Sequence, residues 1–68
     1  MMNSNLLKSV MLYHGDTIKD IAEFLDLSET SVCNKINERG TEFKQGEIAK
    51  IRDRYNLSAD QVESIFFN

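Results

Sequence analysis

Apolar side chains recur along the chain at intervals of three and four residues, the spacing that places them on one face of a helix. Residues 4–14 predict the first helix, with apolar side chains at positions 6, 7, 10, 11 and 13, and Gly15 follows where a left-handed residue often ends a helix. The next stripe is made of Ile18, Ile21, Ala22 and Leu25. Thr17 precedes this stripe and can cap its helix, which is expected to end at the short segment 26–28.

Three further helices are predicted after this segment. The third covers 28–38, the fourth covers roughly 45–55, and the fifth follows Ser58, whose Ser-x-x-Gln sequence is a capping box. Each has an apolar residue before its cap and another at its fourth helical position, a hydrophobic staple. The staple pairs are Leu27–Val32, Phe43–Ile48 and Leu57–Val62. The sequence therefore predicts an all-α fold, a single compact domain over 1–68 of five short helices that tertiary packing must stabilise.

The composition excludes several classes of function. The only cysteine is Cys33 and the only histidine is His14, so neither a disulfide within the chain nor a four-ligand zinc site is expected, and no cofactor is predicted. No nucleophile–base pair, paired carboxylates or Gly-rich phosphate loop is recognisable, which argues against an enzyme. No apolar run approaches the ~20 residues of a membrane span, so no membrane partner is expected. The free cysteine and the lack of a secretory signal pattern predict a cytoplasmic protein.

Residues 17–38 have the pattern of a helix-turn-helix, in which a short turn joins two short helices. The small Ala22 lies where the two helices are expected to cross, and Leu27 in the turn is expected to pack between them. Val32 and Ile36 anchor the second helix in the core. The opposite face of that helix is polar, which is the character that a surface reading base edges needs.

These residues resemble the Cro/repressor family of helix-turn-helix regulators, which are common in phages and bacteria. The resemblance lies in Thr17-Ile18-Lys19-Asp20-Ile21-Ala22, in Leu25-Asp26-Leu27-Ser28, in Val32 and Ile36, and then in Phe43-Lys44-Gln45-Gly46-Glu47-Ile48 and Tyr55-Asn56-Leu57-Ser58. It covers most of the chain, and the ending 61–67 is most similar to small phage and prophage regulators of Gram-positive bacteria. The resemblance implies a sequence-specific transcriptional regulator, a repressor or Cro-like protein, that reads the major groove of operator DNA with helix 28–38.

The resemblance also indicates which side chains contact DNA. Base contacts are expected from Glu29, Thr30 and Asn34, with Cys33 beside them. Phosphate contacts are expected from Ser28 and Lys35, and the charge pattern adds Lys19, Arg39 and Lys44. Two positions depart from the family pattern. Asp26 replaces the usual glycine of the turn, and Glu29 replaces a common glutamine; a carboxylate there repels phosphate, although it can accept from a cytosine amino group.

The charge distribution leaves a second function open. The chain carries 8 basic and 11 acidic side chains, a net charge of −3, whereas DNA-binding domains are usually basic. Residues 28–46 contain three basic and three acidic side chains, and residues 16–27 contain one lysine and four acidic side chains. The alternative is a protein-binding module on the same scaffold, an antirepressor-like partner of another regulator.

The last residues predict a weak homodimer, or dimerisation on DNA only. One small domain reads only a few base pairs, and two copies on a two-fold site commonly supply the affinity that a regulator needs. The contact is expected through the segment around Phe66 and Phe67, where Phe66 is needed for the core and Phe67 is left as a large apolar side chain. In the alternative arrangement, Phe67 folds back over the first helix near Val10 and Met11.

Overall fold

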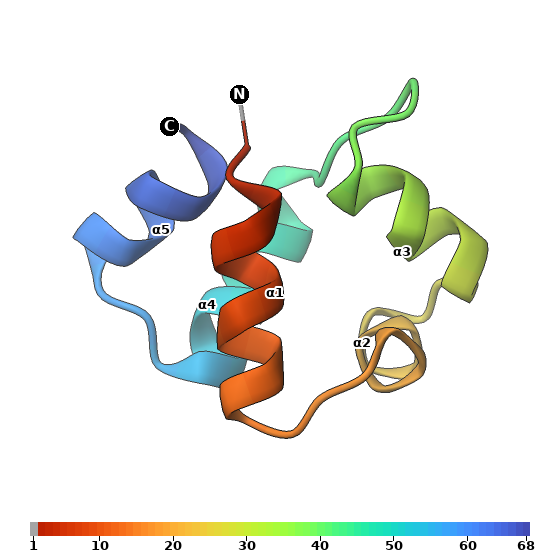
Figure 1. Ribbon diagram of the computed structural model, residues 1–68, viewed down its shortest axis with the longest axis horizontal. Helices are drawn as coiled ribbons and strands as arrows, with labels where there is room; N and C mark the ends of the chain where they lie inside the picture. Colours follow the sequence, from red (N-terminus) through yellow and green to blue (C-terminus); the bar gives the residue numbers. More distant parts are fainter. Residues whose placement is uncertain (1) are drawn as a thin grey trace.

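Residues 2–68 are described in the computed structural model, and within that range the chain forms five α-helices and no strand. The helices are α1 (Ser4–Tyr13), α2 (Ile18–Leu25), α3 (Glu29–Ile36), α4 (Gln45–Tyr55) and α5 (Ala59–Phe66). In Figure 1, α1 stands in the middle, with α5 on one side and α2 and α3 on the other. The domain measures 28 × 25 × 21 Å, so the expected compact all-helical fold is confirmed. No helix of the described chain has the length and apolar composition that crossing a membrane requires.

Side-chain caps begin the helices where the sequence places Thr or Ser before an apolar stripe. At α2, the Asp20 N–H donates to Thr17 Oγ1 over 3.2 Å, and the Thr17 N–H donates to the Asp20 carboxylate over 2.8 Å. At α5, the Ser58 N–H donates to Gln61 Oε1 over 2.8 Å, and the Gln61 N–H donates to Ser58 Oγ over 3.2 Å. The capping box predicted at Ser58 is confirmed, and Thr17 forms a second one.

Left-handed residues end three of the helices. Gly15 follows α1 with φ 76°, Asp26 ends α2 with φ 59°, and Asn56 ends α4 with φ 52°. A glycine at position 26 would adopt this conformation with less strain, because its missing Cβ removes the clash with the backbone. Asp26 nevertheless closes the helix, and the Leu27 N–H behind it donates to the Ala22 carbonyl over 2.8 Å.

The end of α3 corrects the sequence prediction. The helix ends at Ile36 rather than at about 38. Glu38 takes a left-handed conformation with φ 53°, which an α-helix does not accommodate. The Asn37 side-chain amide donates to the Cys33 carbonyl over 3.0 Å and so satisfies one of the last carbonyl groups. The loop 37–44 therefore begins two residues earlier than expected.

The core draws on every helix. Its buried members are Leu7, Met11, Ile21, Ala22, Leu25, Val32, Ile36, Phe43, Ile51, Tyr55, Leu57, Ile65 and Phe66. All six staple residues belong to this cluster or pack against it.

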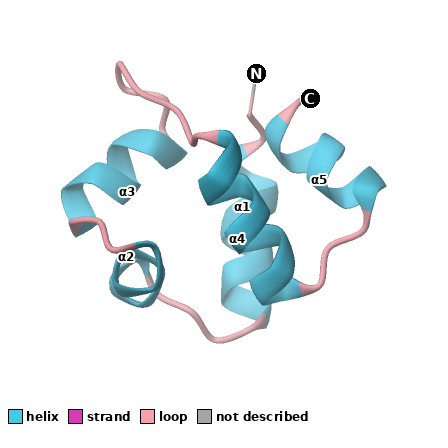
Figure 2. Cartoon of the chain, turned by 180° about the vertical axis from the view of Figure 1, so that it is seen from behind, coloured by secondary structure: helices cyan, strands magenta, loops and turns pink. Residues whose placement is uncertain are grey.

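Tyr13 was predicted on the apolar stripe of α1, but it is 87% exposed, while Leu7 and Met11 of the same helix are buried. Two hydrogen bonds fix the start of α1: the Asn3 N–H donates to the Ile65 carbonyl over 2.7 Å, and the Ser4 hydroxyl donates to the Ile36 carbonyl. Figure 2 shows the same arrangement from behind.

Enlarging Ala22 is expected to destabilise the domain. This side chain is 3% exposed and belongs to α2, which packs against α3. Ala22→Leu should lower the free energy of unfolding by about 1–3 kcal/mol through overpacking. Urea unfolding followed by circular dichroism measures this change, with Ala59→Leu at an exposed site of α5 as the control. Equal midpoints for both variants would contradict the tight packing at Ala22.

Candidate nucleic-acid interface

A three-residue turn joins α2 to α3, and the two helices run in clearly different directions. Figure 1 shows α2 almost end-on while α3 lies across the view. Ser28 caps α3, because its hydroxyl oxygen accepts from the Ser31 N–H over 3.0 Å. Val32 and Ile36 are 0% and 1% exposed and hold one side of α3 in the core. The other side of α3 is left to face outward.

The outward side of α3 carries the four predicted base-contact residues. Glu29 and Thr30 are exposed on the first turn of the helix. Cys33 and Asn34 are half-buried on the following turn, and Cys33 is a free thiol. The first turn is therefore the more exposed part of this side, and it presents a carboxylate and a hydroxyl that can hydrogen-bond to base edges.

Three of the predicted phosphate contacts are exposed cations on separate segments. Lys19 belongs to the first turn of α2, Arg39 to the loop 37–44, and Lys44 to the cap position of α4. Ser28 is exposed as well, but its hydroxyl already donates to Ser31 Oγ over 3.0 Å while it caps α3. Lys19, Arg39 and Lys44 are thus the predicted phosphate contacts that carry an exposed positive charge.

Lys35 requires a correction, because it does not lie on the exposed face. Its side chain is 8% exposed, and its ammonium lies 3.1 Å from Glu47 Oε1 and donates to the Glu42 carbonyl over 3.3 Å. Its ammonium is thus already occupied by two acceptors of the protein itself, which a phosphate would have to displace. Lys35 joins α3 to α4 and to the loop between them, in place of the phosphate contact expected from the sequence.

Glu47 makes two contacts beside Lys35 and Lys44 that the sequence analysis missed. Lys44 occupies the cap position of α4, but an ammonium has no acceptor, so the usual side-chain cap is missing. Glu47 supplies the second hydrogen bond of a capping box, because its Oε1 accepts from the Lys44 N–H over 2.9 Å. Burial alone raises the pKa of Glu47, but the hydrogen bonds from the Lys44 N–H and the Lys35 ammonium outweigh burial and lower it. The signal in the sequence was a glutamate three residues after a poor cap.

A second polar cluster fixes the loop between α1 and α2. Asp16 accepts from Arg54 Nε and Nη2, both over 2.8 Å, and from the Tyr55 hydroxyl over 2.6 Å. The Arg54 guanidinium and then the Tyr55 hydroxyl hold the pKa of Asp16 down, to about 2, against the opposing effect of burial. Burial and the Asp16 carboxylate raise the pKa of Tyr55. These residues connect the start of α2 to the end of α4, so the cluster is structural support for the helix pair.

Aromatic rings flank this cluster on both sides. The Arg54 guanidinium carbon lies 4.6 Å from the centre of the Phe24 ring, which is the geometry of a cation–π contact. The His14 ring stacks on Tyr55 with 4.7 Å between ring centres. Nothing in the local sequence pairs Asp16 with Arg54, which is 38 positions away, so only the fold reveals their contact.

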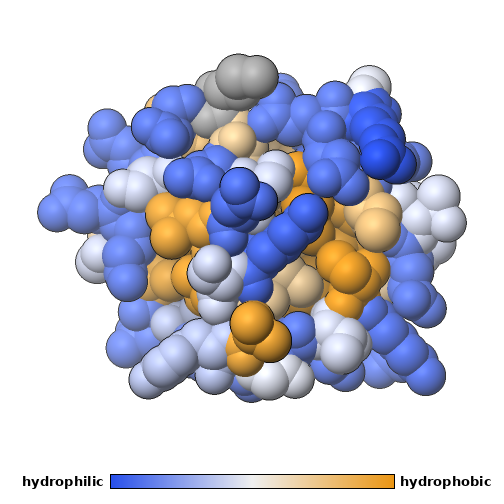
Figure 3. All heavy atoms as spheres, in the orientation of Figure 1, coloured by the Kyte–Doolittle hydropathy of each residue, from blue (hydrophilic) through white to orange (hydrophobic). Residues whose placement is uncertain are grey.

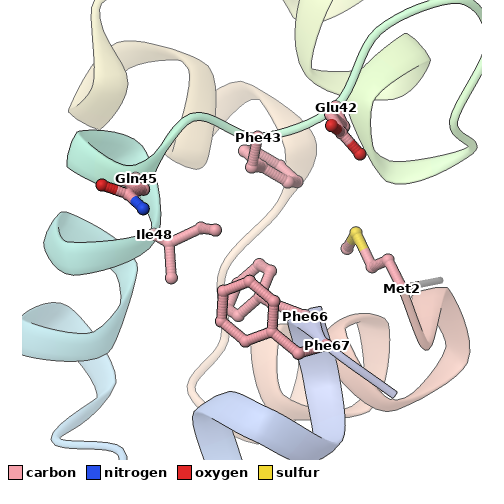
Figure 4. A pocket seen from close by; sticks show the side chains of 7 residues that line it. All are labelled: Met2, Glu42, Phe43, Gln45, Ile48, Phe66 and Phe67. Atoms are coloured by element: carbon pink, nitrogen blue, oxygen red, sulfur yellow. The ribbon is translucent and has the colours of Figure 1, made fainter.

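The end of the chain borders a hollow between α4, α5 and the loop before α4. Figure 4 shows its lining, which consists of Met2, Glu42, Phe43, Gln45, Ile48, Phe66 and Phe67. Phe66 is 8% exposed and meets Phe43 edge-on with 5.9 Å between ring centres, so it is part of the core. The predicted core position of Phe66 is confirmed, and its ring is therefore not free for the dimer contact expected around Phe66 and Phe67. Phe67 is 61% exposed beside this hollow, which corrects the alternative that it covers Val10 and Met11.

The face of the molecule that carries α1 is mostly polar. Figure 3 shows apolar side chains at the surface on both sides of α1, with polar atoms between the two areas. On the side toward α5, a shallow depression includes Leu6, Val10 and Ile65. The apolar surface on this face is therefore divided, and it differs from the polar outward side of α3.

Comparison of the chain with protein-family models, with curated proteins and with solved structures gives no match. The function is therefore inferred from the residues themselves. The chemistry available consists of an exposed polar first turn on α3, three exposed cations on α2, the loop 37–44 and the start of α4, and the exposed side chain of Phe67.

Proposed function

We propose that the protein is a sequence-specific DNA-binding transcriptional regulator that inserts α3 in the major groove, as the resemblance to the Cro/repressor helix-turn-helix family implies. The observation that carries this proposal is the division of α3 into two sides. Val32 and Ile36 are fully buried, while Glu29 and Thr30 are exposed on the first turn. Such a helix is rigid on its inner side and polar on its outer side, which suits direct readout of base edges.

The proposed contacts divide into two chemical kinds. The Thr30 hydroxyl and the Asn34 amide hydrogen-bond to base edges, and the Glu29 carboxylate accepts from a cytosine amino group. Lys19, Arg39 and Lys44 bind phosphate and set the register of the helix in the groove. The protein acts by binding in the cytoplasm, as a repressor or Cro-like regulator of a phage or prophage, rather than as an enzyme.

Few cations are available for phosphate, because Lys35 is paired within the protein and the chain has a net charge of −3. Each phosphate contact adds about 0.9 to the slope of log affinity against log salt. Three contacts therefore give a slope of about −2.7, which is shallow for a DNA-binding protein. Most of the specificity must then come from base contacts and shape.

Substitution of a base contact and of a phosphate contact should give different results. Asn34→Ala is expected to cost about 1–3 kcal/mol at one base pair and to relax the preference there. Lys44→Ala should weaken binding to all sequences about equally and make the salt slope shallower by about 0.9. Fluorescence titration with DNA from the neighbourhood of the protein's own gene measures both effects. Lys50→Ala, at an exposed lysine of α4, is the matched control for charge. Lack of preference for any such DNA at low salt would refute the proposal.

The second candidate is a protein-binding module, an antirepressor-like partner of another regulator. Two large side chains at the end of α1 favour it, because Leu12 is 80% exposed and Tyr13 is 87% exposed. Exposed aromatic side chains are enriched at protein interfaces. The acidic excess of residues 16–27 points the same way, since it repels phosphate. This function takes the place of DNA binding if the titration finds no operator.

Phe67 is expected to support a weak homodimer, on its own or on DNA. Phe67 is 61% exposed beside a hollow with both polar and apolar lining residues, and a second copy related by a two-fold axis presents the same ring and hollow in return. Phe67→Ser should abolish self-association in sedimentation experiments and weaken operator binding. Leu12→Ser removes another exposed apolar side chain, far from Phe67 in the sequence, and is the control. A wild type that stays monomeric at high concentration and a Phe67→Ser variant with unchanged DNA binding would contradict the dimer.

A further inference from the structure

The loop 37–44 connects the proposed recognition helix to α4, and it carries two of the proposed phosphate contacts. Arg39 lies within it and Lys44 ends it. Glu38 and Gly40 both have left-handed backbone conformations, with φ 53° and 75°, so the chain bends sharply here. The position of the two cations relative to α3 depends on what fixes this loop.

One ion pair holds the second half of the loop at two points. The Lys35 ammonium donates to the Glu42 carbonyl over 3.3 Å and to Glu47 Oε1 over 3.1 Å. The same Glu47 oxygen accepts from the Lys44 N–H over 2.9 Å. A single cation on α3 and a single carboxylate on α4 therefore bind the backbone on both sides of Phe43.

The pair is shielded from water, with side-chain exposures of 8% for Lys35 and 17% for Glu47. Buried ion pairs contribute little to stability compared with apolar side chains of similar size, because removing two charges from water is costly. Such a pair does restrain geometry, because each of its hydrogen bonds holds a donor and an acceptor at a defined distance and direction. The geometry here fixes Lys44 relative to α3.

We propose that Lys35 and Glu47 are positioning residues, which hold the Glu42–Lys44 end of the loop against α3 so that the Lys44 cation meets a phosphate while the first turn of α3 meets the bases. This inference rests on the proposed DNA-binding function. Phosphate contacts set the register of a protein on the duplex. A cation that must first be ordered weakens binding, because its loss of freedom is then part of the binding free energy.

Amide hydrogen exchange in the DNA-free protein tests the structural half of the proposal. Lys35→Met retains the length of the side chain but removes both donations. The Lys44 amide is then expected to exchange about tenfold faster than in the wild type, because Glu47 is no longer held beside it. Lys50→Met removes an exposed lysine of α4 and should leave that amide unchanged. Equal protection of Lys44 in the wild type and in Lys35→Met would overturn the proposal.

DNA titration tests the functional half. Lys35→Met should lower operator affinity about tenfold while the salt slope stays the same, since the coupling acts through Lys44 and not through a phosphate contact of its own. Lys44→Met should make the slope shallower by about 0.9, as loss of one phosphate contact requires. A similar change of slope in Lys35→Met would show that Lys35 touches phosphate, and unchanged affinity would show that it does not position Lys44. Either result overturns the proposal.

A double variant covers the case in which Lys35→Met does not fold. Lys35→Met with Glu47→Leu replaces both charges by apolar side chains and leaves no unpaired charge in the interior. It should fold, yet exchange the Lys44 amide faster and bind operator about tenfold more weakly. Wild-type levels of protection and affinity in this variant would overturn the proposal. A wild type that binds no DNA would refute the proposed function and the role in DNA binding, while Lys35-dependent protection of Lys44 would stand as a property of the fold.

Discussion

Lys35→Ala is expected to lower the free energy of unfolding by about 3 kcal/mol. The substitution removes the donor to Glu47 and to the Glu42 carbonyl, and it leaves a carboxylate that is only 17% exposed without its cation. Breaking a buried pair from one side typically costs about 3–5 kcal/mol, and the lower end applies here because Glu47 retains some contact with water. Chemical unfolding at neutral pH measures the loss.

The companion variants decide whether the loss comes from the broken pair. Lys50→Ala removes an exposed lysine and should change stability by less than about 0.5 kcal/mol. Lys35→Met combined with Glu47→Leu should recover most of the lost stability, because no unpaired charge remains in the interior. A double variant as unstable as the sum of the two single variants would show that the residues do not act as a pair.

Asp16→Ala is expected to cost about 2 kcal/mol of folding stability. The Asp16 carboxylate receives two hydrogen bonds of 2.8 Å from Arg54 and one of 2.6 Å from Tyr55, and its side chain is 12% exposed. A fall of its pKa from 3.8 to about 2 corresponds to roughly this free energy, with a reduction because water screens the 30% exposed Arg54 side chain. Asp53→Ala, at a carboxylate that is 73% exposed, is the control and should have little effect.

The stability contributed by the Asp16 charge should depend on pH. The pKa of Asp16 is lower in the folded protein than its ordinary value of 3.8, so the carboxylate stabilises the fold above about pH 4. That contribution is lost as the pH falls from about 4 toward 2, where the folded protein also takes up the proton. Asp16→Asn should therefore be less stable than the wild type at pH 6, and the difference should shrink by pH 2. A difference that stays constant between pH 6 and pH 2 would contradict the role of the charge.

Local sequence signals determined much of the fold. Thr17, Ser28 and Ser58 marked the helix starts, because their oxygens accept from nearby backbone N–H groups. Gly15 and Asn56 marked helix ends, because both adopt left-handed conformations more readily than most residues. These interactions span only a few positions, so they are visible in the sequence. The polar outer side of α3 followed in the same way from the spacing of Val32 and Ile36.

Contacts between distant residues were decided by the tertiary structure alone. Nothing in the local sequence marks Lys35 as a buried lysine. Only the packing of α4 against α3 brings Glu47, 12 positions later, beside its ammonium. Asp16 meets Arg54 across 38 positions for the same reason. Helix spacing predicted that Phe66 is buried and left Phe67 open, but only the packing of α5 brings the Phe66 ring against Phe43 and leaves Phe67 61% exposed. Local patterns thus determine which helices form and which side of each is apolar. How the helices pack determines which charges become paired and which side chains remain available to a partner.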